Sequence, residues 1–170
     1  MIYVVRHGET EWNAINKVLG RTDIPLNAKG IEQAYELARS LKDLEIDVFL
    51  CSPLCRARQT ADAISIETGI RYEIDDRLIE QDFGKFEGVN RFDDGYQEAK
   101  REYFARYPGG ESYFDIAARV FPLLKELDGA NALLVTHGGV CRMIRNYFED
   151  MGNEEFVKFS QGNCEIRFYK

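Results

Sequence analysis

The stretch Ile2-Tyr-Val-Val-Arg-His-Gly8 decides the fold, together with its counterpart Leu133-Leu-Val-Thr-His-Gly-Gly139. Each is an apolar, β-branched run that stops at a histidine followed by glycine, and the chain of 170 residues has no other histidine. A strand that stops at His-Gly places an imidazole at the carboxyl edge of a sheet, where open α/β folds place their ligand crevices. We therefore expect His7 and His137 to share one crevice.

Outward from these runs, short apolar segments alternate with stretches of helical periodicity. Strands are predicted over residues 2–6, 46–51, 70–74, 132–136 and 165–169, and the alternating character of the last strand places it at or near a sheet edge. Helices are predicted after the capping residue Asn27 and over 56–67, 95–107, 115–127 and 140–151. This alternation indicates an α/β fold, a three-layer α/β/α sandwich with a mostly parallel central sheet. We expect a single domain, residues 1–170.

Three of the predicted helices have distinctive side chains. The helix after Asn27 has an apolar face of residues three or four apart, which is expected to be buried: Ile31, Ala34, Tyr35, Ala38 and Leu41. The helix 95–107 aligns Tyr96, Tyr103 and Tyr107 on one side. We expect this aromatic stripe to pack against the rest of the protein and not to bind a ligand. Pro122 lacks a backbone donor and is expected to kink or divide the helix 115–127.

Composition places the chain among ordinary globular proteins, with 45% hydrophobic and 30% charged residues. The first strand begins at Met1 without a basic region or a long apolar run, so we expect neither a signal peptide nor a membrane span and predict a cytoplasmic protein. The four cysteines form no CxxC pair and are predicted to be reduced thiols within the fold: Cys51, Cys55, Cys141 and Cys164.

The net charge of −7 is unevenly distributed. Residues 52–61 and 136–146 each carry two arginines and no acid, beside the turns that follow predicted strands. An acidic body with basic spots only at these turns disfavours nucleic acid as a partner and favours a small anionic ligand.

The triplet Arg6-His7-Gly8 has the chemistry of a phosphate site. Gly8 permits close approach of the backbone, and a helix predicted to start near Glu9 would offer amide donors to an anion. A neutral imidazole with one nitrogen held by a carbonyl keeps a lone pair on the other, which makes it a nucleophile toward phosphorus. Arg6 would supply a forked donor for phosphate oxygens.

Two further segments offer candidate groups. In Ser52-Pro-Leu-Cys-Arg-Ala-Arg-Gln-Thr-Ala61, Arg56 and Arg58 point to different helix faces, and spacing alone does not choose between them. The segment 78–88 carries the acids Glu80, Asp82 and Glu87 among apolar residues, a setting in which one carboxyl group could act as a general acid.

Taken in order, these motifs resemble the histidine phosphatase superfamily, the phosphoglycerate-mutase-like proteins. The matching elements cover nearly the whole chain: Arg6-His7-Gly8-Glu9-Thr10, Asn13, Gly20-Arg-Thr-Asp-Ile-Pro-Leu26, Gly30, Gln33-Ala34, Ser52-Pro53-Leu54, Arg56-Ala57, Thr60-Ala61, Leu78, Glu80, Phe83-Gly84, Glu87-Gly88, Gly110-Glu111-Ser112, Asp115, Arg119 and His137-Gly138. An isolated Arg-His-Gly triplet is a weak signal, whereas this many elements in one order are specific.

The resemblance implies a role for each matched residue. His7 would be transiently phosphorylated, and Glu80 would protonate the leaving oxygen and then activate water. Arg6, Arg56 and His137 would complete the phosphate pocket, with Asn13 and Gly138 as further contacts, which settles the choice between the two arginines in favour of Arg56. Arginines and a second imidazole can stabilise the charge that Mg²⁺ handles elsewhere, so no metal and no cofactor are expected.

The chain departs from the family pattern at two positions near the expected pocket. Leu19 stands where many relatives have glutamine, which puts substrate preference in doubt but not the phosphoryl step. Phe86 replaces a common tryptophan, which keeps an apolar surface and removes an indole donor.

The resemblance implies a metal-independent phosphatase for a small phosphorylated metabolite, similar to broad-specificity acid phosphatases or α-ribazole-phosphate-type phosphatases. The alternatives are a phosphoglycerate mutase, a protein phosphohistidine phosphatase and a phosphate-binding module without turnover. True mutases carry a longer insertion between the segments that match Glu80 and His137, and binding modules usually lose a residue that is present here. The segment around Glu80 and the helix 95–107 are similar to a lid over a small pocket, which disfavours a protein substrate.

A further alternative is that the two histidines are zinc ligands, but neither has a second ligand at metal-binding spacing. The sequence does not indicate an oligomeric state.

Overall fold

A five-stranded sheet forms the centre of the computed structural model, which describes residues 1–170. The strands are β1 (Ile2–Arg6), β2 (Val48–Cys51), β3 (Glu73–Ile74), β4 (Ala132–Thr136) and β5 (Ile166–Tyr169), in the order β3-β2-β4-β1-β5. All neighbouring pairs are parallel except β1 and β5. The predicted α/β class with a mostly parallel sheet is confirmed, and β5 is an edge strand as predicted.

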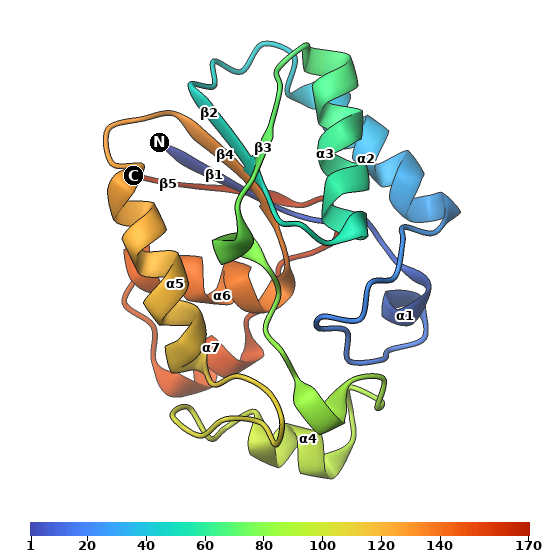
Figure 1. The fold of residues 1–170 in the computed structure, drawn as a ribbon, viewed down its shortest axis with the longest axis vertical. Coiled ribbons are helices and arrows are strands. Elements are labelled where there is room, and N and C mark those ends of the chain that lie inside the picture. Colours follow the sequence, from blue (N-terminus) through green and yellow to red (C-terminus); the bar gives the residue numbers. More distant parts are fainter.

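Helices cover both faces of this sheet (Figure 1). On one face, α2 (Ala28–Ser40) and α3 (Cys55–Thr68) pack over Val5, Leu133 and Val135. On the other face, α5 (Tyr113–Glu126) and α6 (Gly138–Phe148) pack over a larger core that includes Val4 and Leu134. Consecutive residues of β4 are therefore buried on opposite faces, which is why this central strand is apolar throughout its first four positions.

The buried face of α2 differs in part from the predicted one. Asn27 caps the helix through its side chain, which accepts a hydrogen bond from the Gly30 amide. Ala34, Ala38 and Leu41 are buried as predicted, but Ile31 is exposed and Leu37 takes its place in the core. Gly30 also lies on the buried face, because the helix crosses the backbone of Glu9 there and leaves no room for a larger side chain.

The predicted helix 95–107 was wrong in its extent, because α4 (Asp94–Ala99) ends after six residues. The rings of Tyr96 and Tyr107 stack with their centroids 6.1 Å apart and form a cluster with Phe83 and Phe86. In a continuous helix these tyrosines would be separated by about 16 Å along the axis, so this packing requires the chain to fold back. Tyr103 lies elsewhere, against Tyr113 and Phe156.

Other boundaries shift by a few residues, and three short strands are shorter than predicted. Pro122 lies inside α5 without dividing it, and Ser112 begins that helix with a capping box to Asp115. The helix predicted to start near Glu9 is the short α1 (Glu11–Ala14). The chain adds short helices that the sequence did not predict: α7 (Asn153–Lys158) and the 3₁₀ turns η1 (Asp76–Leu78) and η2 (Gly84–Phe86). None of the helices is long and apolar enough to cross a membrane.

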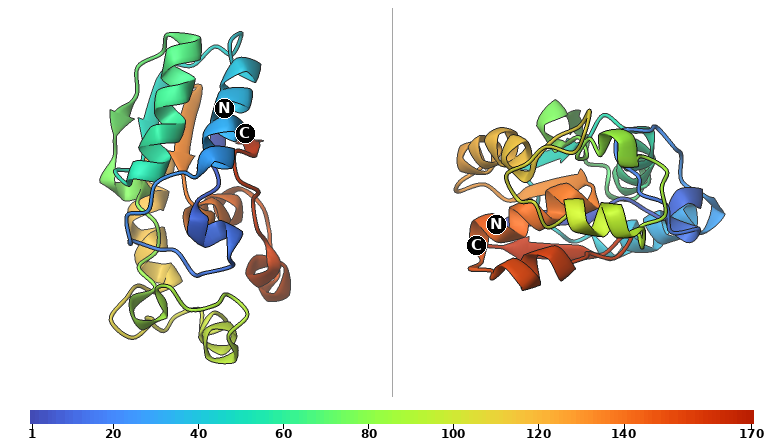
Figure 2. Two further views of the ribbon diagram at one scale, coloured as in Figure 1. Left: turned by 90° about the vertical axis from the view of Figure 1, so that its right-hand side faces the viewer. Right: turned by 90° about the horizontal axis from the view of Figure 1, so that it is seen from below.

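Beyond the carboxyl edge of β1 and β4, the loop that carries α1 and the segment that carries α4 extend away from the sheet (Figures 1 and 2). The chain termini lie side by side at the opposite end, where Ile2 pairs with Tyr169. All four cysteines are free; Cys51 and Cys141 are buried, whereas Cys55 and Cys164 are partly exposed. The fold therefore brings the two His-Gly turns and the α4 segment to one end of the molecule.

Candidate active site

The two His-Gly turns meet because their strands are neighbours in register. Arg6 pairs with Thr136 at the ends of β1 and β4, so the next residues, His7 and His137, emerge side by side. Their ring centroids are 5.1 Å apart with the planes inclined by 56°, and both side chains are buried. The expectation that the two histidines share one site agrees with this geometry.

The hydrogen bonds of His7 define its tautomer. Nδ1 lies 2.7 Å from the carbonyl oxygen of Gly8, which can only accept, so Nδ1 carries the proton. Nε2 therefore has a free lone pair, and it accepts a hydrogen bond from Nε of Arg56 at 3.2 Å. Burial lowers the pKa of His7 well below its ordinary value of 6.5, and the charges of Arg56 and Arg6 add to that effect. The imidazole is thus held neutral with Nε2 available.

Arg56 occupies the first turn of α3 and is fully buried, whereas Arg58 is exposed. Besides His7, its guanidinium donates to the carbonyl oxygens of Thr22 and Gly20, at 3.0 and 2.6 Å. These two carbonyls hold the two terminal nitrogens of the guanidinium, Nη1 and Nη2. The structure therefore brings Arg56, and not Arg58, to the two histidines.

Arg6 approaches from β1 and is anchored by one bond, from Nη1 to the carbonyl oxygen of Gln161 at 2.7 Å. Its Nε is buried and has no hydrogen-bond partner. Burial lowers the pKa of Arg6, and the nearby carboxylate of Glu80 acts in the opposite direction. A buried donor without a partner is costly, so this guanidinium is positioned to bind an acceptor such as a phosphate oxygen.

His137 is the N-cap residue of α6 and is completely buried. Its Nε2 lies 2.6 Å from Oγ of Ser52, the residue that follows β2, while Nδ1 has no partner. Burial lowers the pKa of His137 well below the ordinary value, and Arg56 and His7 lower it further. Ser52 thus fixes the ring and leaves one nitrogen free, a contact that the sequence motif contained but did not explain.

Glu80 lies at the N-terminus of α6, where its carboxylate accepts hydrogen bonds from backbone amides. The Gly139 amide lies 3.1 Å from both carboxylate oxygens, and the Gln81 amide donates to Oε1 at 2.8 Å. A side chain on Gly139 would collide with the carboxylate, because its Cβ would lie 2.6 Å from Oε1. Glu80 is 4% exposed, and its charge acts on both Arg6 and Arg56.

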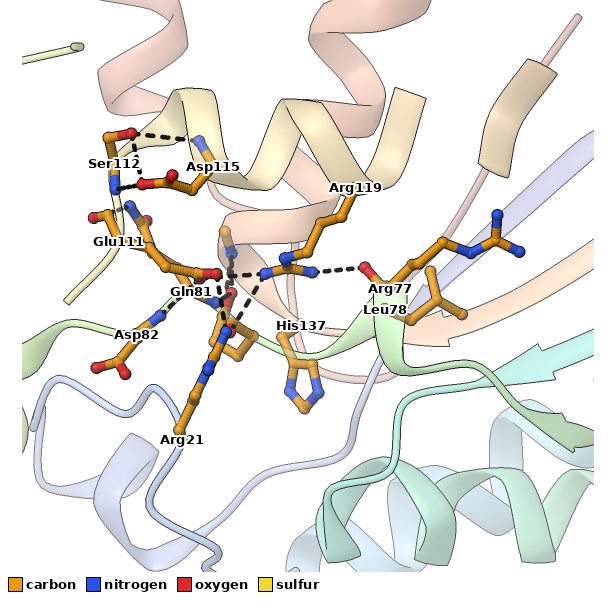
Figure 3. Close-up of polar contacts among 12 residues, drawn as sticks. Arg21, Arg77, Leu78, Gln81, Asp82, Glu111, Ser112, Asp115, Arg119 and His137 are labelled. Carbon is orange, nitrogen blue, oxygen red and sulfur yellow. Dashed lines mark hydrogen bonds and ion pairs between the residues drawn. The ribbon is translucent and has the colours of Figure 1, made fainter. Parts of the chain in front are cut away.

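A polar network fixes the backbone of residues 77–82, the segment that contains Glu80 (Figure 3). Arg119 of α5 donates to the carbonyl oxygens of Arg77 and Glu80 and to the carboxylate of Glu111. Glu111 in turn accepts hydrogen bonds from the Asp82 amide and from Arg21. This network accounts for Glu111 and Arg119 as elements of the sequence motif, since both act on the residues that flank Glu80.

The other two acids of this segment do not reach the histidines. Asp82 accepts a hydrogen bond from the amide of Gly84, the first residue of η2. Glu87 accepts from the amides of Gly20 and Arg21 and from the hydroxyl of Thr22, and so closes the loop 20–22. Among the three candidate acids, Glu80 is the one at the site.

The first three amides after His7 have no donor free for an anion. The amides of Gly8, Glu9 and Thr10 already donate to side chains, those of Thr60, Gln33 and Asn13. The predicted helix near Glu9 is the short α1, which starts at Glu11. The positive charges that act on His7 are those of the Arg56 and Arg6 side chains.

A cavity of about 230 Å³ opens beside these groups. Its lining includes five of the predicted site residues: Arg6, His7, Asn13, Glu80 and Gly138. Leu19 also lines it, in agreement with the expected contact near the substrate, whereas Phe86 packs within the aromatic cluster behind Phe83. Arg56 and His137 lie behind the lining and are fully buried.

Residues 161–164 contribute contacts that sequence reasoning missed. Nδ2 of Asn163 donates to the carbonyl oxygen of His7, and the Cys164 amide donates to that of Arg6. Gln161, fully buried, holds Arg6 through its carbonyl and donates from its side chain to Val4. This segment precedes β5, and only the antiparallel pairing of β5 with β1 brings it to the site, so no local pattern marked it.

No three His, Cys, Asp or Glu side chains converge in a way that could hold a metal ion. The charged groups near the imidazoles are two arginines and one glutamate, a set suited to an oxyanion rather than to a cation.

The fold and this set of groups define a class of protein. The chain belongs to the histidine phosphatase superfamily, branch 1, whose family model matches residues 2–170. It is similar to a probable phosphoglycerate mutase of Salmonella choleraesuis, with 35% identity over an alignment of 148 residues; the match covers 81% of this chain and 69% of the relative.

Solved structures of phosphatases are also similar. A mycobacterial glucosyl-3-phosphoglycerate phosphatase in a complex with VO3 superposes with a TM-score of 0.84 and 27% identity, over 97% of this chain and 90% of that one. A phosphoserine phosphatase of Entamoeba histolytica, in complex with 3-phosphoglyceric acid, superposes with a TM-score of 0.80 and 29% identity, over 97% and 87%. The relatives thus include both phosphatases and a mutase, and a role of either kind fits the chain.

Proposed function

We propose that this chain is a metal-independent phosphatase that hydrolyses a small phosphorylated metabolite through a phosphohistidine on His7. The observation that carries the proposal is the state of His7: its Nδ1 proton is held by Gly8, and its Nε2 lone pair faces Arg56 beside the cavity. A neutral imidazole fixed in this way is a competent nucleophile.

In the first step, Nε2 of His7 attacks phosphorus while the bond from phosphorus to the ester oxygen breaks. The leaving oxygen takes a proton from Glu80, which must be in its protonated form at this moment. The transferred phosphoryl group carries negative charge on its equatorial oxygens, and we assign Arg6, Arg56, Asn13 and His137 to bind them, with Gly138 close to the bound group.

In the second step, water attacks the phosphohistidine in line with the nitrogen. Glu80, now a carboxylate, takes the proton of that water, and the bond from phosphorus to Nε2 breaks to release inorganic phosphate. The cycle returns His7 to its neutral form and Glu80 to its acid form. One carboxyl group therefore serves as acid and then as base.

A mutase is the second candidate, because the similar Salmonella protein is named a probable phosphoglycerate mutase. A mutase would return the phosphoryl group to a product hydroxyl before water could attack. We favour the phosphatase because the chain lacks the longer insertion that mutases carry after the segment matching Glu80. A protein phosphohistidine phosphatase is disfavoured by the α4 segment, whose Tyr96 and Gln97 line the cavity and restrict its size.

The test is a screen of phosphorylated metabolites with phosphate release as the readout, in the presence of EDTA, with mutase turnover of 3-phosphoglycerate measured in parallel. We expect phosphate release that EDTA does not affect. Rapid quenching with ³²P-labelled substrate should give an acid-labile label on the wild type and none on His7→Ala. Mutase turnover without phosphate release, or activity restored by a divalent ion after EDTA, would refute the proposal.

A further inference from the structure

Five basic side chains line the cavity besides Arg6. Lys17 lies over the Trp12 ring and Lys158 pairs with Glu154, and the other three come from the α4 segment and α6: Arg91 in the loop before α4, Lys100 at the end of α4, and Arg142 in α6. None of the three forms an ion pair with an acidic side chain, although ten of the other lysines and arginines of this acidic protein do. Glu80 is the only acidic residue that lines the cavity, and the proposed chemistry already uses it.

Arg142 is the most informative member of this basic cluster. It is buried, with 9% of its surface exposed, and its Nε has no hydrogen-bond partner. One Nη donates to the carbonyl oxygen of Phe159 at 2.8 Å, and the guanidinium lies over the ring of Phe156. A buried guanidinium with a donor left unpaired is costly unless a ligand completes it.

Lys100 has no partner either, and the surrounding charges oppose its protonation. Burial, together with the charges of Arg142, Arg91 and Arg101, lowers the pKa of Lys100 to about 8. Cations that repel one another across a cavity are stabilised when an anion binds between them. The cluster thus has the charge and the unpaired donors of an anion site.

The position of the cluster relates it to the candidate active site. Arg142 lies four residues after Gly138 on the same helix face, about 6 Å along the axis of α6. Gly138 lines the phosphate end of the same cavity. A ligand that spans this distance is a short molecule with a negative group at each end.

We propose that Arg91, Lys100 and Arg142 form a specificity site for a second anionic group, a carboxylate or a phosphate, on the phosphomonoester that the enzyme hydrolyses. This inference rests on the proposed function. It adds a substrate preference to that function: short phosphomonoesters with a second anionic group are preferred over phosphomonoesters of the same size that lack one.

The test compares matched substrates at pH 7, where Lys100 is protonated. For a carboxylate, the pair is 3-phosphoglycerate and glycerol 3-phosphate, and for a phosphate, the pair is ethane-1,2-diol bisphosphate and its monophosphate. We expect kcat/KM to favour the doubly anionic member of at least one pair about tenfold, the effect of one charge-assisted hydrogen bond. The pair that shows the preference identifies the anion.

Two variants and a control test whether the preference for doubly anionic substrates depends on this basic cluster. Lys100→Gln and Arg142→Gln should each reduce it severalfold while kcat/KM for glycerol 3-phosphate, the control substrate without a second anionic group, changes less. Arg101→Gln is the matched control, because Arg101 adjoins Lys100 but pairs with Glu154 and does not line the cavity. Because Lys100 is partly exposed, its variant tests the site even if Arg142→Gln fails to fold.

The outcomes separate this inference from the proposed function. Equal kcat/KM within both pairs, with phosphate released, would overturn the specificity site and leave the phosphatase in place. If no substrate is turned over, calorimetric titration of His7→Ala with the same four compounds still reports on the site. Tighter binding of a doubly anionic compound, lost in Lys100→Gln, supports it, and equal binding within both pairs overturns it.

Discussion

Nε2 of His7 and Nε of Arg56 are joined by a hydrogen bond of 3.2 Å, so the proposed nucleophile directly contacts a cation that would bind the transferred group. A phosphoryl group that enters must replace this bond. The guanidinium need not move far, because the carbonyl oxygens of Thr22 and Gly20 hold its other nitrogens. The arrangement keeps the imidazole neutral and the arginine in place before substrate arrives.

Replacement of Glu80 tests the acid step. Glu80→Gln cannot donate a carboxyl proton, and we expect kcat to fall by about 10²- to 10⁴-fold with alkyl phosphates. Aryl phosphates such as p-nitrophenyl phosphate have leaving groups that need little protonation, so their first step should be affected much less. The measurement is the burst of p-nitrophenol compared with steady-state turnover. Equal losses of the first step on both substrate types would move the acid role away from Glu80.

Arg119 is a positioning residue for Glu80, because it donates to the Glu80 carbonyl oxygen and not to the cavity. Arg119→Met should lower kcat about 10- to 100-fold with little change in KM, since a displacement of the acid by about 1 Å has that effect. The loss should depend on the leaving group as in Glu80→Gln.

Arg106→Gln is the control for Arg119, because it removes another arginine bound to α5, through an exposed ion pair with Asp115. We expect this control to retain activity. A loss in Arg119→Met that is the same for alkyl and aryl phosphates would show general destabilisation instead of positioning.

The two buried histidines make stability depend on pH in mild acid. Both have a pKa lowered well below 6.5, so the unfolded chain binds protons in this range that the folded chain does not. Their contribution is fully present above pH 6.5 and is lost as pH falls below it, by about 1 kcal/mol per histidine per pH unit.

Urea unfolding at pH 7.5 and 5.5 measures this dependence. The wild type should lose roughly 2 kcal/mol between the two values, and the variant His7→Gln/His137→Gln should lose little, because the chain has no other histidine. Carboxylates with a lowered pKa, such as Asp115, lose their contribution only at lower pH and do not enter this window. The same loss in the variant as in the wild type would contradict the assignment.

Gly30 controls the approach of α2 to the turn that carries His7. A Cβ at this position would lie 2.1 Å from the carbonyl oxygen of Glu9. Gly30→Ala should therefore destabilise the protein by about 1–3 kcal/mol and lower activity, because the turn must shift. Gly152→Ala is the control, since a Cβ there meets no atom within 4 Å and should cost less than about 1 kcal/mol. Thermal unfolding of both variants measures the difference.

The order of strands and helices followed from the sequence because each element carries its own periodicity and its own capping residue. Asn27, Gly69 and the two His-Gly turns mark boundaries through local backbone chemistry, and the structure has boundaries at these points. The helix 95–107 failed because contacts between Tyr96 and Tyr107 override local preference, and such contacts have no signature in a short window.

In the candidate site, too, the residues marked by local motifs were predictable, and the contacts made by the tertiary fold were not. Its central residues follow strands or begin helices, where a motif is readable, and the resemblance chose Arg56 over Arg58 where spacing did not. The contacts of Ser52, Asn163 and Arg142 depend on which segments meet in space. The side chains of Thr60, Gln33 and Asn13, which accept hydrogen bonds from the amides of residues 8–10, likewise come from contacts that the local sequence does not mark.

Thr136 links three segments of the candidate site: the end of β1, the segment before Glu80 and the turn at His137. It pairs with Arg6 across the sheet, its hydroxyl donates to the carbonyl oxygen of Leu78, and its chain continues into His137. One residue of the central strand is thus bonded to, or adjoins, each of the segments that carry the proposed nucleophile, the proposed acid and the proposed phosphate ligands. Loops that line the far end of the cavity can change in length or charge without altering these distances, so substrate range and chemical step can evolve independently on this scaffold.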